Sequence, residues 1–248
     1  MYAVIIRACF ACMLFTVALA TIPPYIKVCS RNDPNINMCV ANSIEQLRPK
    51  LTTGIPELDV PTIEPFILKR IQLLKGPKNA KLDFLISNLQ VYGPSTFKIR
   101  DLKVDLKDNI IITFKVNFPK LEFRGKYRID TQILLIRLFG EGNVTGNFLG
   151  YDSNCFLKAN KVLKNNNTHI NFEKMKFNIR VGKAHFNLGN LFNGDEVLGA
   201  AGNEVVNANS HLLVEELTPE LENSLSDLLT NIANKITEKF TYDELFPL

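Results

Sequence analysis

The stretch LTPELENSLSDLLTNIANKITEKF, residues 217–240, carries an apolar side chain at every third or fourth position. In an α-helix that spacing places the apolar side chains on one side, so the stretch predicts an amphipathic helix. The pattern extends back through Leu212 and Val205 to Leu198, and Pro219 predicts a kink or a join between two helices. The apolar positions are Leu217, Leu221, Leu225, Leu228, Ile232, Ile236 and Phe240.

A helix of this length needs a long apolar partner. A coiled coil is one alternative, but strict heptads fail over the full length and charged pairs beside the apolar stripe are missing. We therefore expect the helix to lie against the apolar face of a strongly curved sheet.

The sheet is predicted between about Lys81 and Leu188, where apolar and polar residues alternate. This period of two is typical of half-buried antiparallel strands. The segments GEGN (140–143) and KNNNT (164–168) predict hairpin turns. One face of the predicted sheet is strongly aromatic, and it includes Phe84, Phe114, Phe118 and Phe177.

A second helix is predicted from Pro34 to about Leu51, with Asp33 as its N-cap and Gly54 as its stop signal. The next segment, GIPELDVPTIEPFILKR (54–70), contains three prolines. Because proline cannot donate a backbone hydrogen bond, we expect an extended connection there.

The first twenty residues, MYAVIIRACFACMLFTVALA, resemble a secretory signal peptide, with one basic residue, an apolar run and a small-residue end. The apolar run is shorter than the roughly 20 residues of a membrane-spanning helix, which disfavours an anchor. We expect residues 1–20 to be removed and residues 21–248 to form a single domain. The formal charge of the whole chain is +4 with Lys and Arg dispersed, so the sequence does not predict a nucleic-acid partner.

Three cysteines lie beyond the predicted signal peptide. In an oxidising compartment we expect Cys29 and Cys39 to pair, because they are close in sequence and flank a predicted helix start. A redox role is the alternative, which the spacing disfavours. Cys155 lies on the predicted inward face of a strand and is expected to be a buried free thiol.

The sequence contains no arrangement of residues typical of catalysis. The three histidines, His169, His185 and His211, do not have metal-ligand spacing, and no nucleophile elbow or phosphate-binding loop is present. We therefore expect neither an enzyme nor a metal or cofactor site. Two sequons, at Asn143 and Asn166, fall in predicted turns and are candidates for glycosylation.

Several motifs resemble the insect takeout and haemolymph juvenile hormone binding protein family. They are YIKVCSRNDPNINMCVANSIEQLRPKLTTGIPELDVPTIEPF near the N-terminus, then VYG, FPKLEFRGKYRID, GEGNVTGNF, LFNGDEVLG and the C-terminal YDELFP. The resemblance covers nearly all of residues 21–248. It implies that the family's first disulfide joins Cys29 to Cys39 in this chain. A second bridge found in the hormone-binding branch has no counterpart, which favours the takeout branch.

The resemblance implies an α+β fold of the tubular lipid-binding type, in which a curved antiparallel sheet wraps a long C-terminal helix around a hydrophobic tunnel. Periodicity alone leaves open whether the interior is a solid core or a cavity. The resemblance also implies a secreted carrier, present in haemolymph or another extracellular fluid, of a terpenoid, fatty acid or other lipid. The predicted tunnel-lining residues are Phe84, Phe114, Phe118, Phe177 and Leu228.

Other functions are consistent with the same pattern. The chain could act through its surface as an extracellular signalling protein, for example in circadian or feeding behaviour, with an unidentified receptor. A membrane-active or lipopolysaccharide-binding defence protein would need a basic patch or an exposed apolar tip, and dispersed charges disfavour it. Stable membrane insertion is not expected.

Overall fold

The computed structural model describes residues 22–75, 82–107, 109–133 and 136–248. The predicted signal peptide lies outside these residues. The described chain forms four α-helices, seven strands and three short 3-10 turns. Their bounds are α1 Ile36–Thr53, η1 Pro56–Leu58, β1 Phe66–Lys75, β2 Leu82–Tyr92, η2 Pro94–Thr96, β3 Lys98–Asp105, β4 Ile110–Ile133, β5 Ile136–Lys164, β6 Asn167–Phe172, β7 Lys176–Leu188, η3 Phe192–Gly194, α2 Glu196–Ala208, α3 Ser210–Lys239 and α4 Tyr242–Leu245.

All strand pairs are antiparallel, and the two longest strands, β4 and β5, form the centre of the sheet. β3 pairs with one half of β4, and β2 pairs with the other half. β1 pairs with the far side of β2. β6 and β7 both pair with β5 and follow one another along its far side. The described strands therefore make one sheet with β6 and β7 at one edge.

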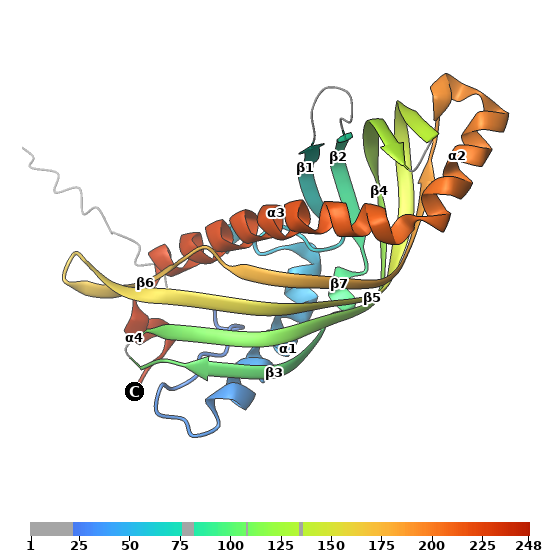
Figure 1. Cartoon of the computed structure of the whole chain (residues 1–248). Helices are drawn as coiled ribbons and strands as arrows, with labels where there is room; N and C mark the ends of the chain where they lie inside the picture. Colours follow the sequence, from blue (N-terminus) through green and yellow to red (C-terminus); the bar gives the residue numbers. More distant parts are fainter. Residues whose placement is uncertain (1–21, 76–81, 108, 134–135) are drawn as a thin grey trace, which may run out of the picture.

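The sheet curls around α3. In Figure 1 the strands β4, β5 and β7 run along the length of the molecule and bend upward at one end, with α3 lying across the concave side. α3 contacts β7 and β6 on one side and β1 on the other. The predicted α+β fold, a strongly curved antiparallel sheet with a long C-terminal helix, is confirmed.

Polar side chains of α2 and α3 bond to the backbone at the edge formed by β7 and β6. We call these residues the polar ladder: Asn203, Asn207, Glu222, Ser226, Thr230 and Asn234. Within each helix they recur every four residues, so they lie on one side of it. An open strand edge carries backbone groups that need partners, and here the helices supply them.

Three asparagines of the polar ladder each bond twice to one residue. The Asn207 amide accepts a hydrogen bond from the backbone N–H of Phe186 at 2.9 Å and donates one to its carbonyl at 2.8 Å. Asn203 bonds in the same way to Leu188, and Asn234 to Phe172. An amide side chain thereby takes the place of a neighbouring strand.

The interior is packed unevenly. At one end of the molecule, side chains of β1, β2, β4, β5, β7, α2 and α3 form a continuous buried cluster that includes Phe84, Ile129, Phe186 and Val206. From Leu221 onward, large apolar side chains of α3 are only half-buried, although Leu221, Leu225 and Leu228 also pack against this cluster. These include Leu221, Leu225, Leu228, Ile232 and Ile236.

The two ends of the described chain meet. The Arg31 guanidinium donates to the Phe246 carbonyl at 2.8 Å and pairs with Asp243, and the Arg31 N–H bonds to the Pro247 carbonyl. The expected disulfide joins Cys29 to Cys39 in α1. These contacts fix the N-terminal segment and α1 to the C-terminal segment that follows α3.

Two predictions near the N-terminus were partly wrong. α1 begins at Ile36 with Asn35 as its N-cap, because the Asp33 carboxylate accepts a hydrogen bond from the Asn35 N–H in a turn before the helix. Gly54 ends α1 as predicted, with a φ of 87°. The segment 54–70 is not a connection throughout, since β1 begins at Phe66 directly after the last of its prolines.

Two further predictions, of a helix join at Pro219 and of a turn at GEGN, were wrong. The join between the C-terminal helices is at Asn209, and Pro219 lies inside α3. The GEGN segment lies inside β5, where it makes no turn, so Asn143 lies within a paired strand and its side chain is exposed. Glycine is needed there for close packing, because a Cβ on Gly142 would clash with the Gly189 carbonyl oxygen.

The KNNNT segment forms a hairpin turn as predicted. Lys164 pairs with Asn167, and the two residues between them, Asn165 and Asn166, have φ values of 51° and 62°. A two-residue hairpin favours such positive φ values, which asparagine tolerates. The Asn166 sequon is therefore exposed at a hairpin tip.

The polar ladder predicts a large effect of one amide on stability. Replacing Asn207 by alanine leaves the N–H and the carbonyl of the buried Phe186 without their partners. We expect the free energy of unfolding to fall by about 1–3 kcal/mol, measured by urea denaturation. The matched control is Asn231→Ala, at an exposed position of α3, with an expected change within about 0.5 kcal/mol. Equal effects of the two substitutions would contradict this role of the polar ladder.

Candidate ligand-binding interior

The inner face of the sheet forms rows of side chains across β4, β5 and β7. Phe114 lies opposite Cys155, which lies opposite Phe177. Phe118 lies opposite Tyr151, and their rings make an edge contact with centroids 5.3 Å apart. Phe118 and Phe177 pack with Leu221 and Leu225 of α3 around Tyr151 and Ile179. The middle of the interior is therefore lined by aromatic and aliphatic groups of both the sheet and the helix.

The structure separates the five predicted lining residues into two environments. Phe84 has no exposed surface and belongs to the tightly packed cluster at the β1–β2 end. Phe114, Phe118, Phe177 and Leu228 are half-buried. Phe114 and Phe177 lie on either side of Cys155, on the two strands that pair with β5. Leu228 comes from α3 and packs against the cluster that contains Phe84.

Three polar side chains on β5 point into this apolar interior. Tyr151, Ser153 and Cys155 alternate along the strand and are all buried. Burial raises the pKa of the Cys155 thiol to about 11, although its weak hydrogen bond to Ser153 acts in the opposite direction. Burial also raises the pKa of Tyr151, with smaller contributions from Cys155 and Glu222. At neutral pH these groups are uncharged hydrogen-bonding groups in an apolar setting.

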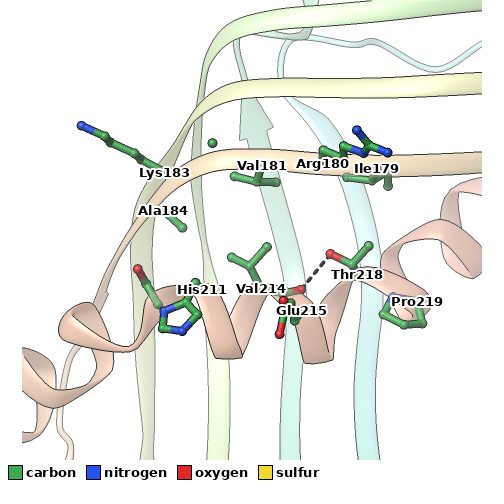
Figure 2. A pocket seen from close by; sticks show the side chains of 12 residues that line it. Ile179, Arg180, Val181, Lys183, Ala184, His211, Val214, Glu215, Thr218 and Pro219 are labelled. Atoms are coloured by element: carbon green, nitrogen blue, oxygen red, sulfur yellow. Dashed lines mark hydrogen bonds between the residues drawn. The ribbon is translucent and has the colours of Figure 1, made fainter.

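A pocket of about 580 Å³ opens between α3 and β7. We call it the α3–β7 slot. Its strand wall is the segment 179–184, and Figure 2 shows Val181 and Ala184 of this wall facing α3 across the opening. Its helix wall consists of Ser210, His211, Val214, Glu215, Thr218 and Pro219.

A second pocket, of about 680 Å³, lies over β3, β4, β5 and β7. Most of its side chains are polar and exposed, among them Lys115, Asn154, Lys176 and Asn178. Lys115 also forms an ion pair with Asp101 at 2.8 Å. This pocket is therefore a surface groove with charged and polar side chains around it, and Phe114 and Phe177 contribute to its lining.

Two features are absent from the part of the chain that the structure describes. Within residues 22–75, 82–107, 109–133 and 136–248, His, Cys, Asp and Glu side chains do not gather in groups of three that could hold a metal ion. Among the described helices, none is both long and apolar enough to span a membrane.

Sequence reasoning missed the polar ladder and the α3–β7 slot. The signal for the polar ladder was present as Asn203 and Asn207, and as Glu222, Ser226, Thr230 and Asn234, each set spaced by four. Such residues on a helix ordinarily indicate a solvent-exposed face. Their bonds to a strand edge depend on tertiary placement, which the spacing does not reveal.

A comparison with protein families matches residues 8–247 to the sequence model described as "Haemolymph juvenile hormone binding protein (JHBP)". Among similar proteins, "Circadian clock-controlled protein daywake" of Drosophila melanogaster is 24% identical over 231 residues, which cover 90% of this chain and 88% of that protein. The "Putative beta-carotene-binding protein" of Schistocerca gregaria is 22% identical over 223 residues, with coverage of 90% and 88%.

Among solved structures, Takeout 1 of Epiphyas postvittana superimposes with a TM-score of 0.75 at 21% sequence identity. The match covers 90% of this chain and 100% of that chain. At this identity the similarity shows a shared fold, which agrees with the curled sheet and the long C-terminal helix described above.

The burial of Cys155 predicts low thiol reactivity. The thiolate is the reactive form, and a rise of the pKa from 9.0 to about 11 lowers its fraction about one hundredfold at pH 8. We expect iodoacetamide to label native Cys155 at least that much more slowly than the urea-unfolded chain. The labelling rate should keep rising with pH up to about 11 in the native protein, but level off near 9 once unfolded.

A cysteine placed at an exposed site is the matched control. Leu163→Cys adds a thiol at the β5–β6 hairpin, where the side chain is 76% exposed, and digestion with mass spectrometry separates its label from that of Cys155. Equal labelling rates of the two thiols in the native protein would contradict the burial of Cys155.

Proposed function

The chain belongs to the haemolymph juvenile hormone binding protein family, and from that membership we propose that it is a carrier of one elongated hydrophobic small molecule. The ligand would lie lengthwise in a tunnel between α3 and the inner face of the sheet. The family consists of binding proteins, so we propose no catalytic step. The ligand class is a terpenoid, a fatty acid or another largely apolar lipid.

The observation that carries this proposal is the half-burial of large apolar side chains along the interior. Phe118, Phe177 and Leu225 pack around the same inner cluster, yet each retains accessible surface. Protein cores are ordinarily packed as densely as organic crystals, and the side chains of the cluster around Phe84 are almost fully buried. A looser apolar region next to a solid one is what a binding cavity requires.

Burial supplies the binding energy. At about 25 cal/mol per Å², shielding a few hundred Å² of apolar ligand surface gives several kcal/mol, and the entropy cost of association offsets part of it. The names of the family and of the Schistocerca gregaria relative mention juvenile hormone and beta-carotene. A sheet and helix that share this fold are suited to molecules of similarly extended and apolar character.

The polar groups inside set limits on the ligand. Tyr151, Ser153 and Cys155 are uncharged at neutral pH and lie among apolar side chains. A charged group of the ligand would lose its hydration there without an opposite charge on β5 to compensate. We therefore propose that the part of the ligand beside β5 is uncharged.

The same proposal includes secretion. Residues 1–20 would direct export, residues 21–248 would fold as one domain, and glycans at Asn143 and Asn166 would project from exposed positions. The family description places the relatives in haemolymph, and extracellular fluid is the compartment that we propose here.

A space-filling substitution distinguishes a cavity from a solid core. Leu228→Trp adds volume at a half-buried position of α3. If the neighbouring space is a ligand cavity, the indole occupies it. We then expect the affinity for cis-parinaric acid to fall at least tenfold while the free energy of unfolding stays unchanged. Fluorescence titration and urea denaturation measure the two quantities.

The control is Leu163→Trp at the exposed β5–β6 hairpin, which should leave both quantities unchanged. A solid core predicts a different result for Leu228→Trp, because overpacking lowers stability by about 1–3 kcal/mol. That loss of stability, with binding of the probe unaffected, would count against the cavity.

A further inference from the structure

The polar ladder is interrupted at the α3–β7 slot. Counting on from Asn207 in steps of four gives His211, Glu215 and Pro219, all of which line the slot. Within the described residues, helix side chains make hydrogen bonds to the β7 backbone at Ile179 and from Phe186 onward, but none between these two positions. The helix therefore lies beside the strand here without being bonded to it.

The backbone of the edge is irregular at the same place. The backbone N–H groups that bond to the helices belong to Ile179 and, farther along β7, to Phe186 and Leu188. Ile179 is odd-numbered, whereas Phe186 and Leu188 are even-numbered. The alternation of a strand must change phase between them. Gly150 of the neighbouring strand has a φ of 65° beside this point, which fits a local irregularity in the pairing.

Breaks in regular helical bonding bound the helix wall of the slot. α3 begins after Asn209, which has non-helical backbone angles. Pro219 has no N–H to donate to the Glu215 carbonyl four residues earlier. Figure 2 shows the Thr218 hydroxyl bonded to the Val214 carbonyl within the helix, at 2.7 Å, so this side chain also makes no bond to β7.

The floor of the slot is part of the apolar interior. Val214 and Ala184 pack against the cluster that contains Phe84, and Val181 packs against the cluster around Tyr151. Charged residues of the rim, Arg180, Lys183 and Glu215, are exposed. The floor of the slot is thus apolar and continuous with the interior clusters, while its rim is charged.

We propose that the α3–β7 slot is the entrance through which the ligand passes into the interior. This inference rests on the carrier function proposed above and adds a route and a ligand class to it. The ligand has an apolar tail, which passes between Val181 and Val214, and one polar end, which the rim accommodates. At about 580 Å³ the slot is within the range of small-molecule sites.

A reversible bridge across the slot tests this route. Ala184→Cys and His211→Cys place thiols on opposite walls, as Figure 2 shows for the native side chains. A bis-methanethiosulfonate reagent that spans the slot links them, and a reductant that leaves the native disulfide intact releases the link. The native Cys155 is not replaced in these variants, because its buried thiol is inaccessible to the reagent. Stopped-flow fluorescence records the uptake and release of cis-parinaric acid.

The matched control bridges the same helix and the same edge elsewhere. Lys174→Cys and Asn223→Cys replace an exposed pair that is already joined by a hydrogen bond of 2.6 Å. We expect the bridge across the slot to slow uptake and release at least tenfold, with recovery after reduction, and the control bridge to leave both rates unchanged.

The outcomes separate the two proposals. Uptake that is equally fast with the slot bridged and released would overturn the entrance while leaving the carrier function standing. Slowing by both bridges would also overturn it, because a general loss of mobility would then explain the effect. If the wild-type chain does not bind the probe, the carrier function fails, and the entrance fails with it.

Discussion

The closure of one sheet edge by helix side chains is the interaction on which the rest of the structure depends. Without partners, the backbone groups of β6 and β7 would form an open edge along the whole far side of β5. The polar ladder satisfies groups of this edge at Phe172, Ile179, Phe186 and Leu188 and fixes the helices to the sheet at the same time. The sheet can then curl around α3 instead of pairing with another strand.

This arrangement explains how an apolar interior can coexist with a well-fixed helix. The polar side of α3 holds the sheet edge, so its apolar side is directed inward without having to pack tightly along its whole length. A large cluster of buried side chains lies at the end around Phe84 and Phe186, where α2 also contributes. Farther along, the interior keeps accessible apolar surface, and the slot lies where the polar ladder is interrupted.

Much of the fold could be predicted from the sequence, because periodicity reports which side of an element is apolar. The stripe from Leu217 to Phe240 indicated the long helix, and alternation indicated the strands. Local signals failed where a residue has different uses in different contexts. Gly142 resembles a turn residue but permits close packing of Gly189, and Pro219 is accommodated within α3 while the break occurs at Asn209.

The candidate site was harder to predict for a related reason. An inward-facing phenylalanine has the same pattern in a solid core as in a cavity wall, so Phe84 could not be distinguished from Phe118 by spacing. Their different burial depends on how many neighbours the curled sheet brings to each. The α3–β7 slot joins two elements that α2 separates in the sequence, and only the tertiary fold brings them together.

The central claim is that the interior holds a ligand, and native mass spectrometry of the protein secreted from insect cells tests it most directly. The native mass is compared with the mass of the same sample after denaturation. We expect a non-covalent adduct of a few hundred daltons that is lost on denaturation. Equal native and denatured masses, unchanged after incubation with excess cis-parinaric acid, would contradict the claim.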